Sequence, residues 1–464
     1  MTRLAPLALI LVAALALAAC ARQSALEAFA EVPMAYSAVP LDGPGRALHQ
    51  HADQPMNPAS VMKLVTSQAA LELLGPAFRW QTWLYTDGVQ DGEVLRGNLY
   101  LVSGGDPALT RERLWSLLAR LRARGIRHIE GDLVLDGSYF RLPETPPVFD
   151  DDGDNPYAPY LTQPDALLAG FRLVQISAEA GQEGVRVSME PEMPSLVLDN
   201  RLQRGAPEQP CPRRGALIGV PERAGDGTWQ LPLRGELPPG CGVRRYHALG
   251  NSEDYTAHLV RTLWTGQGGT FGGDTRAGIL PAGTTLLAAT SSPDLATLIR
   301  DINKHSNNVM TRQLFLTLGA QYRRAGDRDD LEAARRVVGR WLAAQGITEG
   351  VVLDNGSGLS RHERLSTRQL TTLLAHARES NWAPEFISSL PITGVDGTMR
   401  HRGRDLAGQG RIKTGSLRDV RAIAGYVRDD AGTTWAVAAI INDEQAGRWQ
   451  PQLDAWLRAV AAGR

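Results

Sequence analysis

Lysine is nearly absent from this chain of 464 residues. The sequence contains 49 Lys and Arg side chains, and only Lys63, Lys304 and Lys413 are lysine. Because a guanidinium keeps its proton in proteins, arginine serves wherever only a positive charge is needed. The three lysines are therefore candidates for a chemical role that requires an amine able to release a proton.

Neither sign of charge is in excess. The 49 basic and 50 acidic side chains leave a formal net charge of −1, and the sequence has no local basic patch. This balance gives no attraction to nucleic acid, so we expect no nucleic-acid partner. With 43% hydrophobic and 21% charged residues, the composition is that of a folded protein, and the length predicts two or three domains.

Long apolar runs are missing after the first twenty residues. Arg3 is followed by an apolar stretch, residues 4–19, and then by Cys20. A charged start, a short apolar stretch and small residues at its end indicate a secretory signal, which is too short for a comfortable membrane span. The ending Leu17-Ala18-Ala19-Cys20 also resembles a bacterial lipobox, which would place a lipid on Cys20; ordinary cleavage nearby is the alternative. We predict export to the periplasm, with or without a lipid anchor.

Cysteine is also scarce, with three in the chain. Once Cys20 is removed or lipidated, Cys211 and Cys241 remain as an even pair in an oxidising compartment, which favours a disulfide over two free thiols. The loop that this bridge would close is worth about 3–4 kcal/mol in the chain-entropy model. Neither this pair nor the nine histidines have metal-ligand spacing, so we predict no metal.

The pattern of apolar residues divides the rest of the chain into regions. Strand and helix patterns between residues 80 and 135 predict a β–α–β unit. A loop rich in Pro and Asp follows at 141–165, and the alternating, turn-rich segment 166–247 predicts a small β domain. The part after residue 286 predicts helices and then three strands, at 410–416, 423–427 and 435–441.

Ser60 and Lys63 lie in a segment, residues 57–74, whose apolar spacing predicts a helix with Asn57 as its cap and Pro58 in the first turn. A hydroxyl and an amine three residues apart share one helix face. A buried lysine near another cation can take the proton of the hydroxyl and make it a nucleophile. The N–H groups of a first helical turn can stabilise the resulting oxyanion. This spacing alone also occurs by chance, with the lysine solvated.

Two further motifs carry polar side chains in short spacing. Ser306-Asn307-Asn308 stands between two predicted helices, where Ser306 can relay a proton and Asn308 can hold Lys63, although Ser and Asn there also suit a helix cap. In Lys413-Thr414-Gly415-Ser416, a permanent positive charge and two hydroxyls can bind a carboxylate. Gly415 lets a peptide backbone approach as an added strand, and the Ser416 N–H can serve as a second oxyanion donor. The alternative is a strand end with a solvated lysine.

Taken together and in this order, the three motifs resemble those of the penicillin-recognising serine enzymes, the DD-peptidases and serine β-lactamases. The long interval between Ser60 and Ser306 resembles the penicillin-binding protein 4 family of D-alanyl-D-alanine carboxypeptidase/endopeptidases, since a compact β-lactamase has no room for it. Other stretches resemble the same family: residues 104–107, 131–136, 354–361 and 395–398.

This resemblance implies an α/β (α+β) fold with a serine β-lactamase/DD-peptidase-like transpeptidase domain and two smaller inserted domains. The expected ranges are 21–88 and 286–464 for the catalytic domain, 89–165 and 248–285 for a β–α–β domain, and 166–247 for a mainly β domain.

The resemblance also implies roles for single residues. Ser60 would be acylated, Lys63 would be the base, and Ser306 and Asn308 would complete the proton network. The residues expected to bind substrate are Lys413, Thr414, Gly415, Ser416, Arg361 and Asp136. For Arg361 a surface ion pair is an equal alternative, and for Asp136 a turn residue.

The implied reaction is acyl transfer to water without a cofactor. Peptidoglycan stem peptides would lose terminal D-Ala, D-Ala–diaminopimelate cross-links would be cleaved at the same centre, and β-lactams would inhibit covalently. One alternative is a serine β-lactamase, although no Glu-x-x-Leu-Asn segment lies between the first two motifs and Ser306 stands where one class has Tyr. The other alternative is a catalytically silent cell-wall binding protein, which would not need Lys63 in place of Arg.

Overall fold

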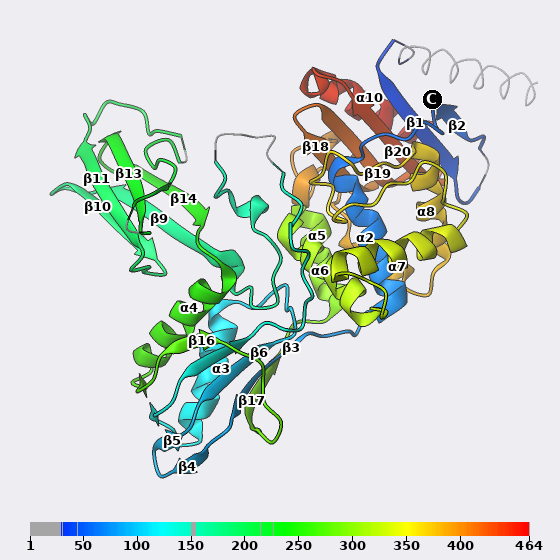
Figure 1. Ribbon diagram of the computed structural model, residues 1–464. Coiled ribbons are helices and arrows are strands. Elements are labelled where there is room, and N and C mark those ends of the chain that lie inside the picture. The colour runs from blue at the N-terminus through cyan, green and yellow to red at the C-terminus, as the bar shows by residue number, and fades with distance from the viewer. Residues whose placement is uncertain are drawn as a thin grey trace, which may run out of the picture. The chain divides into compact units, whose positions relative to one another are not determined.

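The chain folds into two compact units in a computed structural model that describes residues 29, 31–43, 45–149, 155–213, 215–225 and 227–463 (Figure 1). The predicted secretory signal and Cys20 lie outside the described residues. Unit 1 comprises the described residues of Met1–Phe78, Pro143–Phe149 and Pro293–Arg464, and unit 2 those of Arg79–Leu142 and Asp150–Ser292.

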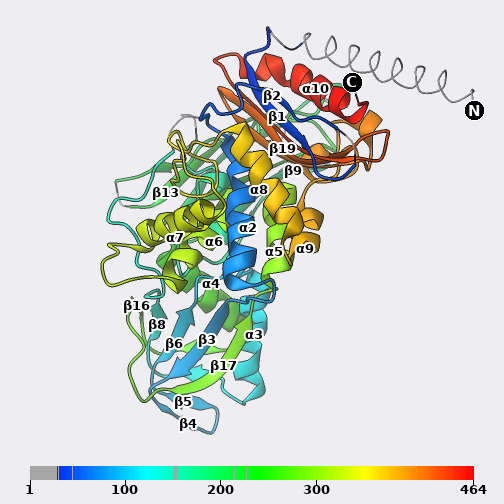
Figure 2. The ribbon, with the colours of Figure 1, turned by 90° about the vertical axis from the view of Figure 1, so that its right-hand side faces the viewer.

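Unit 1 is built on an antiparallel five-stranded sheet with the strand order β18-β19-β20-β1-β2. The strands are β1 (Met34–Pro40), β2 (Leu48–Gln50), β18 (Gly410–Leu417), β19 (Val420–Arg428) and β20 (Thr434–Asn442). Nearly every residue of β19 and β20 is buried. The reason is that α10 (Gln450–Ala461) packs against β19, while α8 (Thr367–Glu379) packs against β20 and β1 (Figure 2). Such two-sided burial explains the continuous apolar sequence of the central strands.

A buried helix, α2 (Lys63–Leu74), runs through the helical part of unit 1 and contacts α5, α6, α7 and α9. The surrounding helices are α5 (Leu295–His305), α6 (Asn308–Gln321), α7 (Asp330–Ala344) and α9 (Ala383–Ser389). The predicted helix at 57–74 begins differently from the expectation, because the 3-10 turn η1 (Ala59–Met62) precedes α2. The Asn57 carboxamide oxygen accepts the Ala59 N–H at 2.9 Å and so fixes this turn rather than capping the α-helix.

The described residues of unit 2 form four sheets and two α-helices, α3 (Arg111–Ala123) and α4 (Ser252–Gly266). The mixed sheet β16-β8-β6-β3-β17 consists of β3 (Gln81–Thr86), β6 (Leu99–Ser103), β8 (Leu133–Asp136), β16 (Thr275–Ala277) and β17 (Thr285–Ser291). The sheet β15-β7-β5-β4 consists of β4 (Val89–Asp91), β5 (Val94–Arg96), β7 (His128–Ile129) and β15 (Thr270–Phe271).

The other two sheets of unit 2 match the segment 166–247 predicted as a small β domain, except that β14 ends one residue beyond it, at Ala248. They are β10-β9-β14, with β9 (Leu173–Ala180), β10 (Val185–Glu190) and β14 (Gly242–Ala248), and β11-β13-β12, with β11 (Leu196–Arg204), β12 (Glu222–Arg223) and β13 (Trp229–Leu237). The predicted disulfide is confirmed: Cys211 and Cys241 are bonded, with 5.5 Å between their Cα atoms.

The boundaries between the two units of the structure differ from the domain boundaries predicted from the sequence. The sequence places residues 79–88 and 286–292 in the catalytic domain, whereas β3 and β17 pair with each other in a sheet of unit 2. Segment Pro143–Phe149 of the predicted loop belongs to unit 1. The separation of the remaining insert into two domains stays a prediction.

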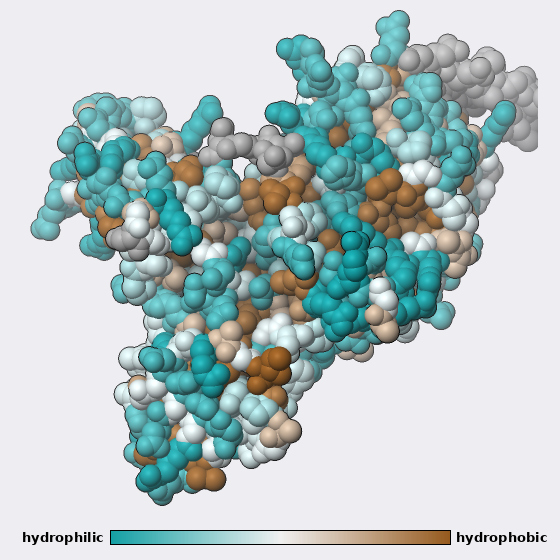
Figure 3. Space-filling view, viewed as in Figure 1, coloured by the Kyte–Doolittle hydropathy of each residue, from teal (hydrophilic) through white to brown (hydrophobic). Residues whose placement is uncertain are grey.

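The surface is mixed in polarity. On the face seen in Figure 3, hydrophobic residues lie in separate patches among hydrophilic ones. No helix in the described part of the chain is both long enough and apolar enough to cross a membrane.

Candidate active site

The Ser60 hydroxyl and the Lys63 amine are in direct contact. Ser60 lies half-buried in η1, and Lys63 is the first residue of α2, so the turn between the two elements sets their spacing. Lys63 Nζ stands 2.9 Å from Ser60 Oγ and 2.6 Å from Asn308 Oδ1, and it also donates to the carbonyl oxygen of Ser357. The amine is thus held at three oxygens.

The surroundings of Lys63 favour a neutral amine. Its side chain is 0% exposed. Burial holds the pKa of Lys63 well below its usual value, the nearby charge of Lys413 lowers it further, and Glu363 opposes the shift. A neutral amine donates two hydrogen bonds, here to Asn308 and Ser357, and accepts one from the Ser60 hydroxyl. Lys63 is therefore placed to take the proton of Ser60.

The second motif presents Ser306 and Asn308 to the two lysines. Ser306 follows the last residue of α5 as its C-cap, and its backbone has a left-handed conformation with φ of 55°. Asn308 is the first residue of α6. The middle residue, Asn307, performs the capping, since its side chain accepts the Met310 N–H at 3.0 Å. The side chains of Ser306 and Asn308 are left to contact Lys413 and Lys63 respectively.

Lys413 on strand β18 contacts Ser306 Oγ at 2.9 Å and the Thr414 carbonyl oxygen at 2.7 Å. The sequence predicts a permanent positive charge at this position. The side chain is instead 0% exposed, and burial lowers the pKa of Lys413 to about 7, so its charge depends on pH. Lys413 is therefore in direct contact with the Ser306 hydroxyl, and its role in binding a substrate carboxylate stays a prediction.

Hydroxyl groups gather beside Lys413. The Thr414 and Thr398 hydroxyls are 2.8 Å apart, and Ser416 on the same strand is exposed. Thr398 belongs to the short helix η4 (Gly397–Met399), in one of the stretches that carry the family resemblance. These hydroxyls can donate to a carboxylate.

Strand β18 lies at the edge of its sheet and packs on the turn that holds Ser60. A Cβ atom on Gly415 would lie 2.6 Å from the Pro58 carbonyl oxygen and 3.2 Å from the Ser60 nitrogen, so only glycine allows this approach. The contact brings the backbone of Gly415 next to that of Ser60. An edge strand beside a nucleophile can receive an extended peptide as a further strand.

Arg361 and Asp136 both have partners of their own. The Arg361 guanidinium pairs with Asp419 and lies over the Phe149 ring, with its Cζ 5.6 Å from the ring centroid. In unit 2, Asp136 accepts the N–H groups of Ser138 at 2.9 Å and Leu280 at 2.8 Å. Their roles in binding the peptide stem stay predictions.

Three residues at the site are missing from the sequence-based prediction: Ser357, Glu363 and Thr398. Ser357 stands between two glycines, and a glycine pair of this kind is a signal for close backbone approach. Glu363 lies in the charged run Arg361-His362-Glu363-Arg364, which is typical of an exposed loop, yet it is 0% exposed. Among the described residues, no group of three or more His, Cys, Asp or Glu side chains is arranged to hold a metal ion.

Two proteins named as carboxypeptidases are similar in sequence to this chain over most of its length. A D-alanyl-D-alanine carboxypeptidase of Actinomadura sp. (strain R39) is 31% identical over 414 residues, which cover 84% of this chain and 74% of the relative. D-alanyl-D-alanine carboxypeptidase DacB of Haemophilus influenzae is 27% identical over 416 residues, or 84% of this chain and 81% of the relative.

Solved structures agree with the sequence matches. The crystal structure of penicillin binding protein 4 (dacB) from Haemophilus influenzae has a TM-score of 0.76 at 25% identity, covering 92% of this chain and 95% of that one. A second structure of that protein, complexed with a β-lactam, has a TM-score of 0.70. The predicted fold class is thereby confirmed. The family model for D-Ala-D-Ala carboxypeptidase 3 matches residues 17–460, and the chain belongs to this S13 family.

Proposed function

We propose that this chain is a serine-type D-Ala-D-Ala carboxypeptidase and endopeptidase that acts on peptidoglycan stem peptides through an acyl-enzyme on Ser60. The observation that carries the proposal is the 2.9 Å contact between Ser60 Oγ and the fully buried amine of Lys63. A serine hydroxyl becomes a nucleophile when an adjacent base accepts its proton. Membership of the S13 family and the two carboxypeptidase relatives support the substrate.

Acylation begins with the D-Ala–D-Ala peptide bond beside Ser60. Ser60 Oγ attacks the carbonyl carbon while its proton passes to Lys63 Nζ, and the oxyanion forms near the N–H groups of Ser60 and Ser416. The peptide C–N bond then breaks, and the leaving amine receives the proton held by Lys63, relayed through the Ser306 hydroxyl that Lys413 contacts at 2.9 Å, so that Lys63 is neutral again. The terminal carboxylate of the substrate meets the hydroxyls of Thr414, Ser416 and Thr398.

Water completes the reaction by attacking the acyl-enzyme carbonyl. Lys63 accepts the proton of the water and returns it to Ser60 Oγ as the ester C–O bond breaks, so that Ser60 leaves as the free hydroxyl. Cleavage of a D-Ala–diaminopimelate cross-link follows the same path with a larger leaving amine. A β-lactam enters the first step and stays bound to Ser60, as supported by the β-lactam complex of the Haemophilus influenzae relative.

The place of action follows from the substrate. Peptidoglycan lies outside the cytoplasm, which supports export by the N-terminal segment and agrees with the Cys211–Cys241 disulfide. We extend the proposal to the periplasm and to lipidation of Cys20 after cleavage. Mass spectrometry of the mature chain, isolated from membranes, would detect the mass of a diacylglycerol and an N-acyl chain on Cys20.

The central experiment is intact-mass spectrometry of the mature protein with benzylpenicillin over time. We expect a penicilloyl adduct that persists and that is missing in Ser60→Ala. Release of D-Ala from muropeptides should then be measured with the same two proteins. An adduct that clears within seconds while penicillin is consumed would indicate a β-lactamase. Absence of any adduct would reject Ser60 as the nucleophile and favour a silent binding protein.

A further inference from the structure

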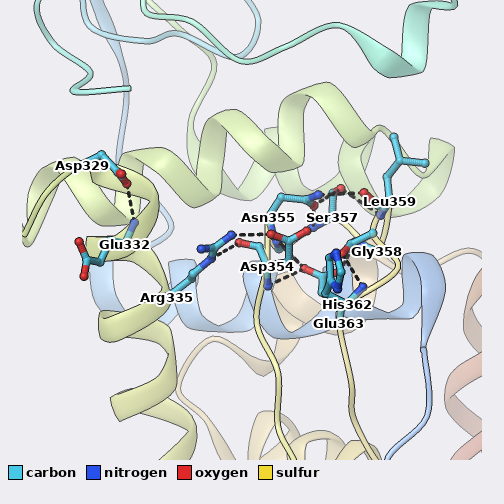
Figure 4. Close-up of polar contacts among 12 residues, drawn as sticks. Asp329, Glu332, Arg335, Asp354, Asn355, Ser357, Gly358, Leu359, His362 and Glu363 are labelled. Carbon is cyan, nitrogen blue, oxygen red and sulfur yellow. Dashed lines mark hydrogen bonds and ion pairs between the residues drawn. The ribbon is translucent and has the colours of Figure 1, made fainter. Parts of the chain in front are cut away.

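A buried carboxylate, Glu363, lies at the centre of a loop formed by residues 354–358 (Figure 4). Its Oε1 accepts the backbone N–H groups of Gly356 at 2.7 Å and Asn355 at 3.1 Å, with the Asp354 nitrogen at 3.4 Å. Its Oε2 accepts the Gly358 N–H at 2.8 Å. The loop thus wraps its amide groups around one side chain.

No Lys, Arg or His side chain in the described part of the chain forms an ion pair with Glu363. The nearby Asp354 has such a partner, since Arg335 pairs with it at 2.5 Å. A buried charge without a counter-ion is expensive unless hydrogen bonds offset the loss of water. Converging backbone N–H groups provide that offset for an anion. The loop N–H groups therefore stabilise the carboxylate form of Glu363 and offset part of the cost of its burial.

The opposite side of this loop faces the nucleophile and its base. The Ser357 carbonyl oxygen accepts from Lys63 Nζ, and the Gly356 carbonyl oxygen accepts from Thr66 Oγ1 of the same helix at 2.6 Å. Gly358, with φ of 81°, lies so close that a Cβ atom would collide with the Ala59 carbonyl oxygen and stand 2.6 Å from the Ser60 nitrogen. The loop therefore directs its N–H groups to Glu363 and the carbonyl oxygens of Gly356 and Ser357 to side chains of α2.

We propose that Glu363 is a positioning residue for the Ser60–Lys63 pair: it holds the 354–358 loop against both residues and supplies the negative charge that stabilises the Lys63 ammonium formed as Ser60 is deprotonated. This inference rests on the proposed function, because it assumes that Lys63 accepts the proton. It adds a residue that contacts neither Ser60 nor Lys63 directly, since the loop stands between them.

Several charges act on Lys63. Lys413 on β18 and Arg312 on α6 lower its pKa, whereas Glu363 raises it. The pKa of Glu363 is itself raised to about 7 by burial and by Asp354, against the pull of the loop N–H groups. Above this pH the carboxylate is charged and makes Lys63 a stronger base. Removing the charge leaves an amine that loses its proton at lower pH and accepts a proton less readily.

The test is the pH profile of penicillin acylation, measured as a second-order rate from about pH 5 to pH 9. In Glu363→Gln we expect the acid limb that the titration of Glu363 near pH 7 adds to the wild-type profile to be lost, because glutamine carries no charge at any pH. The plateau rate should fall about tenfold, since general-base catalysis weakens with the basicity of the amine. Glu363→Asp, which keeps the charge on a shorter side chain, should lower the plateau but keep the wild-type limb.

Glu332→Gln is the matched control, because it makes the same chemical change at an exposed ion pair of α7. This variant should leave both the acid limb of the pH profile and the plateau of the acylation rate unchanged. A lower plateau in Glu363→Gln with an unmoved limb would overturn the electrostatic part of the proposal. If Glu363→Gln does not fold, a wild-type plateau in Glu363→Asp would overturn the positioning role. A wild-type protein that forms no adduct would instead reject the proposed function itself.

Discussion

The three lysines of the chain differ in their contacts. Lys304 forms an ion pair with Asp396 at 2.5 Å, which arginine can also form. Lys63 and Lys413 instead contact hydroxyl, amide and carbonyl oxygens, which accept equally from an ammonium or a neutral amine. At these two positions the contacts therefore allow the amine to change its protonation state.

Replacing Lys63 by arginine separates charge from proton transfer. We expect Lys63→Arg to acylate with benzylpenicillin about 10²- to 10⁴-fold more slowly, which is the usual contribution of a positioned general base. The guanidinium keeps a positive charge near Asn308 but does not accept the Ser60 proton. The second-order acylation rate, followed by intact mass, measures this loss.

Lys304→Arg is the control for that substitution. The ion pair with Asp396 needs only a positive charge, so this variant should acylate at close to the wild-type rate. Acylation by Lys63→Arg at the wild-type rate would contradict the assignment of Lys63 as the base. Equal losses in both variants would point to a general intolerance of arginine in unit 1.

Single residues of the site were predictable to the extent that they belong to short motifs. Ser60, Lys63, Ser306, Asn308 and Lys413 follow from spacing, and the structure brings their side chains into contact. Glu363 did not follow, because a charged residue between His362 and Arg364 is normally exposed. Its burial depends on the 354–358 loop folding around it, which no local pattern records.

At the scale of elements, the 354–358 loop and strand β18 both touch the turn that carries Ser60. Each does so at a glycine, Gly358 or Gly415. Alanine at Gly358 would destabilise the fold for two reasons. Its backbone would have to adopt a φ of 81°, which is unfavourable for a residue with a Cβ atom, and that atom would collide with the Ala59 carbonyl oxygen. We expect Gly358→Ala to displace Ser60 and to abolish detectable acylation, with a lowered thermal unfolding midpoint.

Gly408 separates the two effects, because it has the same φ of 81° but nothing within 4 Å of an added Cβ atom. Gly408→Ala should lose about 1–2 kcal/mol of stability from the left-handed backbone alone and still acylate normally. Calorimetry and the acylation rate are measured on both variants. Normal acylation by Gly358→Ala would show that the loop does not support Ser60.

Elements were predicted best where one pattern decides the structure. The strand expected at 410–416 is β18, and its edge position follows from the sheet order. The start of the helix carrying Ser60 was mispredicted, because Asn57 and Pro58 are equally good for a cap and for the turn that they form. Ala59, with φ of 45°, takes a left-handed conformation that packing against Gly358 and Gly415 enforces.

For the whole molecule, the division into units depends on pairing between distant segments. Strands β3 and β17 are separated by nearly the whole of unit 2, yet they pair with each other. The sequence pattern indicates strand β3 but not its pairing, and β17 is not among the predicted strands, so the predicted boundaries do not group the two. Among the residues that the structure describes, the side chains hydrogen-bonded to Ser60, Lys63 and Lys413 nevertheless belong to unit 1.

This separation predicts that the stability of unit 2 and the chemistry of Ser60 respond differently to loss of the disulfide. Cys211 and Cys241 both lie in unit 2 and close a loop of 30 residues. The double variant Cys211→Ser/Cys241→Ser should lose about 3 kcal/mol of unfolding free energy, because the unfolded chain gains the entropy of the open loop. Urea unfolding measures this change.

Penicillin acylation of the same double variant should keep the wild-type rate in buffer, since the residues of the described part of the chain that are hydrogen-bonded to Lys63 belong to unit 1. The unfolding curve should then show an earlier transition for unit 2 while Ser60 remains reactive. Variant Cys241→Ser alone controls for the free thiol and should be destabilised to the same extent. A fall in acylation that parallels the early transition would mean that unit 2 supports the conformation of the site, and that the two units unfold as one.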